Sequence, residues 1–133
     1  MQLEARKYLF DIQQAARRLE EFTAGRTFEH YVADAMLRSA VERQFEIVGE
    51  ALAQLRKLVP EASGAVTDAA RIIAFRNILV HGYADVDDRL VWNIVETKLP
   101  TLIADVGRLI AAEPDPPARK DPSREGPPSA GNA

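Results

Sequence analysis

The chain has 133 residues, a formal net charge of −3 and no cysteine. This length fits one domain with a modest core, and the lack of cysteine excludes a disulfide framework and a thiolate metal site. The slightly acidic balance argues against an extended nucleic-acid interface, which would rely on many Lys/Arg–phosphate contacts, so any RNA contact should be local.

The N-terminal segment carries the charged run Glu4-Ala5-Arg6-Lys7 and no long apolar stretch. It predicts neither a signal peptide nor a membrane span. We therefore expect a cytoplasmic protein without a membrane partner.

Two long helices are predicted in the first half of the chain. The first runs from about Leu3 to Phe22, and Gly25 follows it at a position suited to the left-handed conformation. Thr27 is expected to cap a short helical turn. The second helix extends from about Asp34 to Val59 and ends at Pro60.

The second half begins with a predicted loop over residues 61–66. Thr67 or Asp68 is expected to cap the next helix, and Gly82 should close it. Acidic residues over 85–88 favour another helix start, because negative charge is stabilised at a helix N-terminus.

The last predicted helix keeps its apolar period from Leu90 to Leu109, so Pro100 should kink it and not end it. No stretch alternates at period two, and the predicted fold is all-α, an up-and-down bundle of four to five helices over residues 1–112. Residues 113–133 contain six of the eight prolines and predict a disordered tail.

The run from Ile72 to Tyr83 is the most apolar segment, yet it contains four polar side chains: Arg76, Asn77, His81 and Tyr83. On a helical wheel at about 100° per residue, Arg76 shares a stripe with Ile72 and Leu79. A cation there is costly unless an anion or a cavity meets it. Because the helix is apolar on almost every side, its own bundle or a second chain must cover more than one side.

Each polar residue also has a purely structural interpretation. A histidine near a helix end, such as His81, is often a surface or core residue with satisfied hydrogen bonds. Arg76 can pack its stem beside the isoleucines and extend its guanidinium to water.

Arg76 and His81 are the residue types that RNA cleavage without a metal would need. Cleavage without a metal needs a base for the 2′-hydroxyl, an acid for the leaving 5′-oxygen and a cation at the phosphate. Histidine suits acid or base work, and the planar fork of arginine suits phosphate. On one straight helix Arg76 and His81 lie about 140° apart, and the other histidine, His30, lies in a different segment.

A two-fold dimer removes both difficulties, because it brings two copies of the helix to one cleft. Two histidines and two arginines could then surround one phosphate, and the second apolar side of the helix would be covered. Asn77, one turn before His81, would orient the imidazole or contact the phosphate.

The segment from Arg76 to Tyr83 resembles the R-x4-H-x-Y motif of the HEPN superfamily, and more narrowly its HepT-like branch. The segments 45–51 and 91–100 resemble two further helices of that family. Gly82 departs from the pattern, in which Glu is frequent at this position. The resemblance covers most of residues 1–112 and implies a HEPN-like helical bundle.

The resemblance implies a homodimeric endoribonuclease toxin that needs no metal or other cofactor, with Arg76 and His81 as catalytic residues and Asn77 in support. It also implies a nucleotidyltransferase antitoxin of the MntA type, which transfers AMP to Tyr83 and can join the dimer in a larger complex. Added phosphate would occupy the arginines that the RNA needs. The structural alternative for Tyr83 is a phenol packed beside Leu79.

Two other functions remain open. The first is a non-catalytic helical module that binds a nucleotidyltransferase or a nucleotide, and the second is a structural adaptor. Glu46 and Glu50 lack the histidines of a di-metal site and are expected to form surface or inter-helix ion pairs. Acidic residues 85, 87 and 88 are expected to be helix caps, since the calcium-loop pattern is absent. The basic pairs at 17–18 and 56–57 indicate a solvated face more than a cleft rim.

Overall fold

The computed structural model describes residues 1–82 and 85–112, and its regular elements are all helical. The helices are α1 (Leu3–Thr23), α2 (Phe28–Ala33), α3 (Ala35–Leu58), α4 (Pro60–Gly64), α5 (Ala69–His81), α6 (Asp88–Thr97) and α7 (Leu99–Ala112). The all-α prediction is therefore confirmed, with α2 and α4 as short additions to five longer helices. Tyr83 and the predicted tail over residues 113–133 lie outside the described residues.

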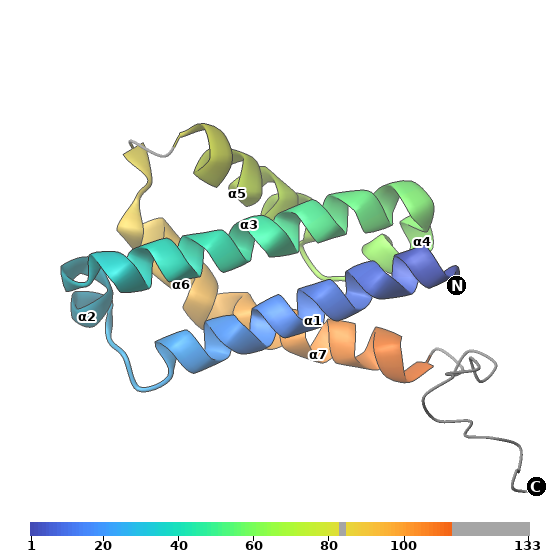
Figure 1. Ribbon diagram of the computed structural model, residues 1–133, viewed down its shortest axis with the longest axis horizontal. Helices are drawn as coiled ribbons and strands as arrows, with labels where there is room; N and C mark the ends of the chain where they lie inside the picture. Colours follow the sequence, from blue (N-terminus) through green and yellow to red (C-terminus); the bar gives the residue numbers. More distant parts are fainter. Residues whose placement is uncertain (83–84, 113–133) are drawn as a thin grey trace, which may run out of the picture.

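Helix α3 is the centre of the bundle (Figure 1). It runs antiparallel to α1, and α7 packs against α1. Helix α5 packs chiefly against α3, while α6 leads into α7 and contacts α2. This arrangement leaves α5 at the outside of the bundle, with one side against α3.

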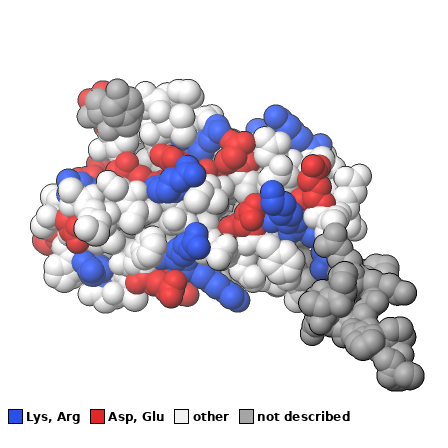
Figure 2. Space-filling model, viewed as in Figure 1, with Lys and Arg blue, Asp and Glu red and all other residues white. Residues whose placement is uncertain are grey.

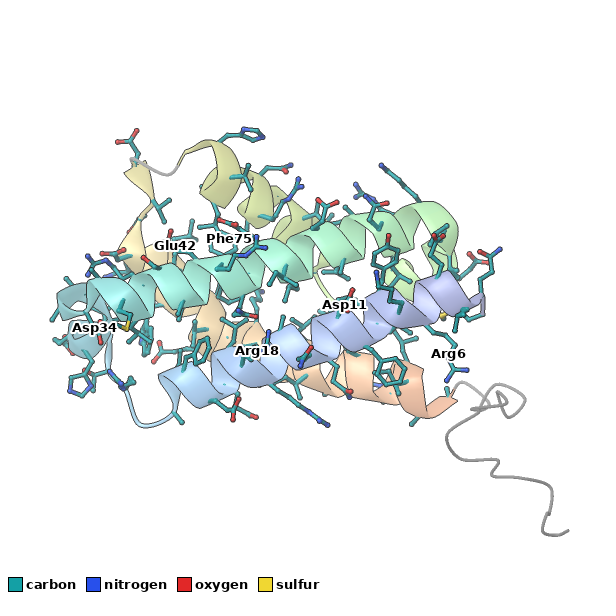
Figure 3. All side chains as sticks on the ribbon, in the orientation of Figure 1. Arg6, Asp11, Arg18, Asp34, Glu42 and Phe75 are labelled. Atoms are coloured by element: carbon teal, nitrogen blue, oxygen red, sulfur yellow. The ribbon has the colours of Figure 1, made fainter. Side chains whose placement is uncertain are left out.

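The core follows the apolar period of the long helices. Phe45 of α3 meets Phe75 of α5 edge to face, with ring centroids 5.3 Å apart. Figure 3 shows Phe75 between these two helices. At the N-terminal end of α3, the centroid of the buried Tyr31 ring lies 5.3 Å from that of the Trp92 ring. The most buried aliphatic side chains are Leu9, Ile12, Leu19, Val41, Val48, Leu52, Leu55, Val91, Leu102 and Val106.

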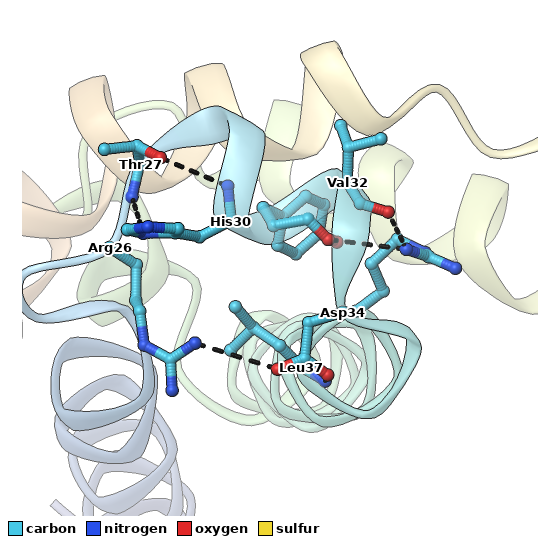
Figure 4. A network of polar contacts seen from close by, with 8 residues as sticks. Arg26, Thr27, His30, Val32, Asp34 and Leu37 are labelled. Atoms are coloured by element: carbon cyan, nitrogen blue, oxygen red, sulfur yellow. Dashed lines mark hydrogen bonds and ion pairs between the residues drawn. The ribbon is translucent and has the colours of Figure 1, made fainter.

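The helix starts near residues 27 and 34 are fixed by side-chain caps (Figure 4). Thr27 Oγ1 accepts a hydrogen bond from the His30 N–H at 3.1 Å, and the Thr27 N–H donates to His30 Nδ1 at 3.0 Å. Asp34 Oδ1 accepts from the Leu37 N–H at 3.0 Å. Both predicted starts are confirmed, as is the left-handed Gly25, whose φ is 71°. His30 is committed to this local cap.

The predicted loop over residues 61–66 is wrong, because residues 60–64 form α4. Pro60 ends α3 but also starts α4, since its fixed φ and missing N–H suit the first turn of a helix.

The last helix is divided, whereas the sequence predicted a kink: α6 ends at Thr97 and α7 starts at Leu99. Pro100 has no N–H to donate to the carbonyl four residues earlier, and its ring would collide with that carbonyl.

Asp68 stands at the predicted position before α5 but does not cap it with its side chain. Its backbone is left-handed, with φ 59°, and its carboxylate pairs with Lys98 Nζ at 2.7 Å. The Thr67 N–H donates to the buried carboxylate of Asp105 at 2.8 Å. Two polar contacts thus tie the start of α5 to Lys98, between α6 and α7, and to Asp105 of α7.

Charges of both signs are mixed on the face shown in Figure 2, and no continuous basic surface is visible on its described part. Within residues 1–82 and 85–112, no helix is both long and apolar enough to cross a membrane.

Candidate active site on helix α5

Helix α5 presents two different sides. Its inner side carries Ile72, Phe75 and Leu79, each less than 5% exposed. It ends at His81, directly before Gly82, as predicted, and the Gly82 N–H donates to the Ile78 carbonyl at 2.7 Å. The outer side carries Asn77 and His81, which are exposed.

Arg76 lies between these two sides and leans onto α3. Its Nη2 donates to Glu50 Oε1, forming an ion pair between α5 and α3. Its Nη1 donates to Asn77 Oδ1 at 2.7 Å. Of the alternatives left open by the sequence, an anion therefore meets Arg76, and this anion is Glu50.

Glu50 is held from its own helix as well. Its Oε2 accepts a hydrogen bond from Gln54 Nε2 at 3.0 Å. One turn earlier, Glu46 pairs with Arg43 at 3.3 Å on the surface. The expectation that these two glutamates form ion pairs is confirmed, and Glu50 forms the inter-helix one.

Gly49 allows the close approach of Arg76 to α3. A Cβ atom added to Gly49 would overlap the Arg76 Cβ and lie 2.7 Å from its Cγ. Sequence reasoning gave Gly49 no role beyond the family resemblance. The available signal was the cost of glycine inside a long helix, about 0.5–1 kcal/mol relative to alanine, which indicates a close backbone approach.

The structure brings Asn77 onto Arg76 but does not bring Arg76 and His81 together. His81 is exposed at the last position of α5, while the Arg76 guanidinium is directed to α3. The remaining predicted site residue, Tyr83, lies outside the described residues. Within one chain, the two candidate catalytic groups therefore diverge.

Apolar side chains surround the outer side of α5. Ile78 is 47% exposed and Val80 is 41% exposed. A groove of about 290 Å³ runs between α5 and α6, lined by Phe75, Ile78, Leu90 and Ile94 among others. Leu90, the first apolar residue of the predicted last helix, is 38% exposed at this groove. The bundle thus leaves one side of α5 uncovered.

A family model described as "Ribonuclease HepT-like" matches residues 12–109. A protein of Thermococcus cleftensis named "Probable ribonuclease HepT" is 35% identical over 106 residues, which are 77% of this chain and 92% of that protein. Two similar proteins have names that begin "Putative RNase". One, from Caldanaerobacter subterraneus subsp. tengcongensis, is 33% identical over 108 residues, or 81% of this chain and 96% of that protein.

The other, from Methanocaldococcus jannaschii, is 31% identical over 103 residues, or 77% of this chain and 94% of that protein. No solved structure matches the chain significantly. Three observations point to the same family: the sequence motif Arg76–Tyr83, the all-helical bundle and the similarity to these proteins. The chain belongs to the HepT-like ribonuclease family.

Proposed function

We propose that this protein is a metal-independent endoribonuclease whose active site forms between two copies of α5. The observation that carries the proposal is the arrangement of the R-x4-H motif: Arg76 is held against α3 by Glu50, and His81 is exposed at the helix end. Membership of a family described as ribonuclease supports the reaction class.

In the proposed reaction, one His81 takes the proton of a ribose 2′-hydroxyl, and the 2′-oxygen attacks the adjacent phosphorus. The bond from phosphorus to the 5′-oxygen breaks, and the second His81 gives this leaving oxygen a proton. The products are a 2′,3′-cyclic phosphate and a free 5′-hydroxyl. The Arg76 guanidinium stabilises the negative charge that gathers on the phosphate oxygens.

Two features support a homodimer. Arg76 and His81 diverge on one chain, so a single copy supplies an incomplete site. Ile78, Val80 and Leu90 expose apolar surface around α5, and a second copy would remove this surface from water. A two-fold axis beside α5 would meet both needs.

The proposed biological role is that of the toxin in a toxin–antitoxin pair. It rests on the resemblance of the motif, in which the antitoxin is a nucleotidyltransferase that transfers AMP to Tyr83. Mass spectrometry after co-expression with such a partner should find one adenylyl group per chain. The group should be absent from Tyr83→Phe, and its persistence in that variant would contradict the assignment.

RNA cleavage in the presence of a chelator tests the enzyme directly. The wild type should cleave, whereas His81→Ala and Arg76→Ala should lose activity by at least about 100-fold. This is the usual size of a general acid–base contribution for His81 and of a lost charge-stabilising group for Arg76. His30→Gln is the matched histidine control, because glutamine at this position retains a capping-box side chain. Arg43→Ala is the arginine control. An inert wild type would favour the non-catalytic binding module.

A mixed dimer of one wild-type chain and one His81→Ala chain tests the shared site. It keeps both arginines but only one of the two histidines that the proposed reaction uses. Co-expression of differently tagged chains, followed by purification over both tags, should give a dimer whose cleavage falls by at least about 100-fold, as in the His81→Ala homodimer. Half of the wild-type activity in this mixed dimer, or a wild type that sediments as a monomer, would refute the composite arrangement.

A further inference from the structure

The approach of α5 to α3 fixes the stem of Arg76. With Gly49 lacking a side chain, the first two carbons of the Arg76 side chain lie directly on the α3 backbone. The side chain of Arg76 is 27% exposed, so most of its length is covered although its helix is at the surface. The stem therefore has little freedom to choose another rotamer.

The guanidinium is fixed from two sides. Glu50 on α3 accepts from Nη2, and Asn77 on α5 accepts from Nη1 at 2.7 Å. Gln54 donates to the second oxygen of Glu50 at 3.0 Å, so the carboxylate itself is oriented. These described contacts use two of the five N–H donors of arginine, and a phosphate oxygen can approach the others.

A contribution to stability alone does not explain why the Arg76–Glu50 ion pair is held by so many contacts. Exposed pairs contribute little because water screens them and two long side chains lose freedom, and the side chain of Glu50 is 47% exposed. Orientation of a group that acts on a phosphate is different, because a displacement of about 1 Å can reduce a rate by about 100-fold.

We infer that Glu50 is a positioning residue for the reaction: it orients the Arg76 guanidinium toward the scissile phosphate, with Gly49 admitting the arginine stem. This inference rests on the proposed ribonuclease function. Glu50 does not touch the reacting atoms in this arrangement and acts through Arg76. Its negative charge opposes binding of the anionic substrate, so its benefit must lie in the transition state.

Steady-state kinetics of Glu50→Gln test this inference. The variant keeps the length and shape of the side chain but loses the charge. It should lower kcat by about 10- to 100-fold and leave KM unchanged or lower. Glu46→Gln is the matched control, because it removes the same charge one turn away, where the partner is Arg43. Equal kcat values for the two variants and the wild type would overturn the inference.

The same substitution in an Arg76→Ala background separates positioning from a general structural effect. Glu50→Gln should then cause no further loss of kcat, because the group that it orients is gone. A further loss of the original size would show that Glu50 acts independently of Arg76 and would overturn the inference.

NMR order parameters of the arginine Nε–H groups give a readout that does not depend on activity. Arg76 should be rigid in the wild type and in Glu46→Gln, and in Glu50→Gln it should approach the mobility of the exposed Arg43. An unchanged Arg76 order parameter in Glu50→Gln would overturn the positioning role. If wild type leaves RNA intact, the proposed function fails, and the NMR result still decides whether Glu50 fixes Arg76.

Discussion

Replacing Gly49 with alanine tests the close packing of α5 on α3. In a helix interior this change ordinarily stabilises a protein by about 0.5–1 kcal/mol, because glycine loses more freedom on folding. Here the added methyl group overlaps the Arg76 Cβ and approaches the Ile72 carbonyl oxygen to 3.5 Å. The Arg76 Cβ is fixed to its backbone, so relief requires α5 to move away from α3.

The two terms can be compared. Overpacking of a well-packed contact costs about 1–3 kcal/mol, which exceeds the gain from losing a glycine. The net expectation is a loss of about 1–2 kcal/mol in the free energy of unfolding. For a domain of this size, such a loss lowers Tm by about 4–8 °C.

Gly107→Ala in α7 is the control, since an added Cβ there has no neighbour within 4 Å. It should raise the free energy of unfolding by about 0.5–1 kcal/mol. Thermal and urea unfolding of both variants at one protein concentration would give the comparison, because the proposed dimerisation would make Tm concentration-dependent. If Gly49→Ala stabilises the protein as much as Gly107→Ala, the tight contact under Arg76 does not exist.

Three further predictions concern stability and pH. Burial alone would raise the pKa of Asp105, but hydrogen bonds led by the one from Thr67 hold it below its usual range. Asp105→Asn should therefore lower Tm at pH 7, and this difference should shrink as the pH falls below about 4. Glu42 behaves oppositely: burial, followed by repulsion from Asp88, raises its pKa. Glu42→Gln should raise Tm at pH 7, with the advantage vanishing near pH 4, where the folded wild type is also protonated. Thr27→Ala removes the cap of α2 and should cost about 1 kcal/mol in urea unfolding, whereas an unchanged midpoint would show that the cap is dispensable.

The helices themselves were predictable because each buries one apolar stripe. Helix α3, expected from about Asp34 to Val59, spans Ala35–Leu58. The two wrong predictions of secondary structure lie at prolines, which can end a helix or begin one. Pro60 stops one helix and starts another, and Pro100 divides the last helix. Their outcome depends on the packing of the flanking segments, which local sequence does not contain.

The sequence predicted what kind of group should lie beside Arg76 but not which residue supplies it. The stripe position of Arg76 indicated an anion or a cavity beside it, but which anion meets it depends on how α3 and α5 are aligned along their length. That alignment is set where Gly49 meets the arginine stem, and neither helix specifies it alone. In the proposed dimer the relation between Arg76 and His81 would depend on a second chain, which the sequence of one helix does not describe.

Helix α5 is only weakly amphipathic, as expected for a helix that its own bundle would cover on one side and a second chain on another. The bundle covers the inner side chains of α5, and Leu79 is only 2% exposed. A helix that only its own bundle covers would carry polar residues on its outer side. Instead Ile78 and Val80 remain outside, beside His81. Keeping apolar side chains exposed in every free monomer lowers solubility, so their presence is explained if the monomer is not the working state. In the proposed dimer, a second copy that covered Ile78 would also bring its Arg76 to the His81 of the first chain.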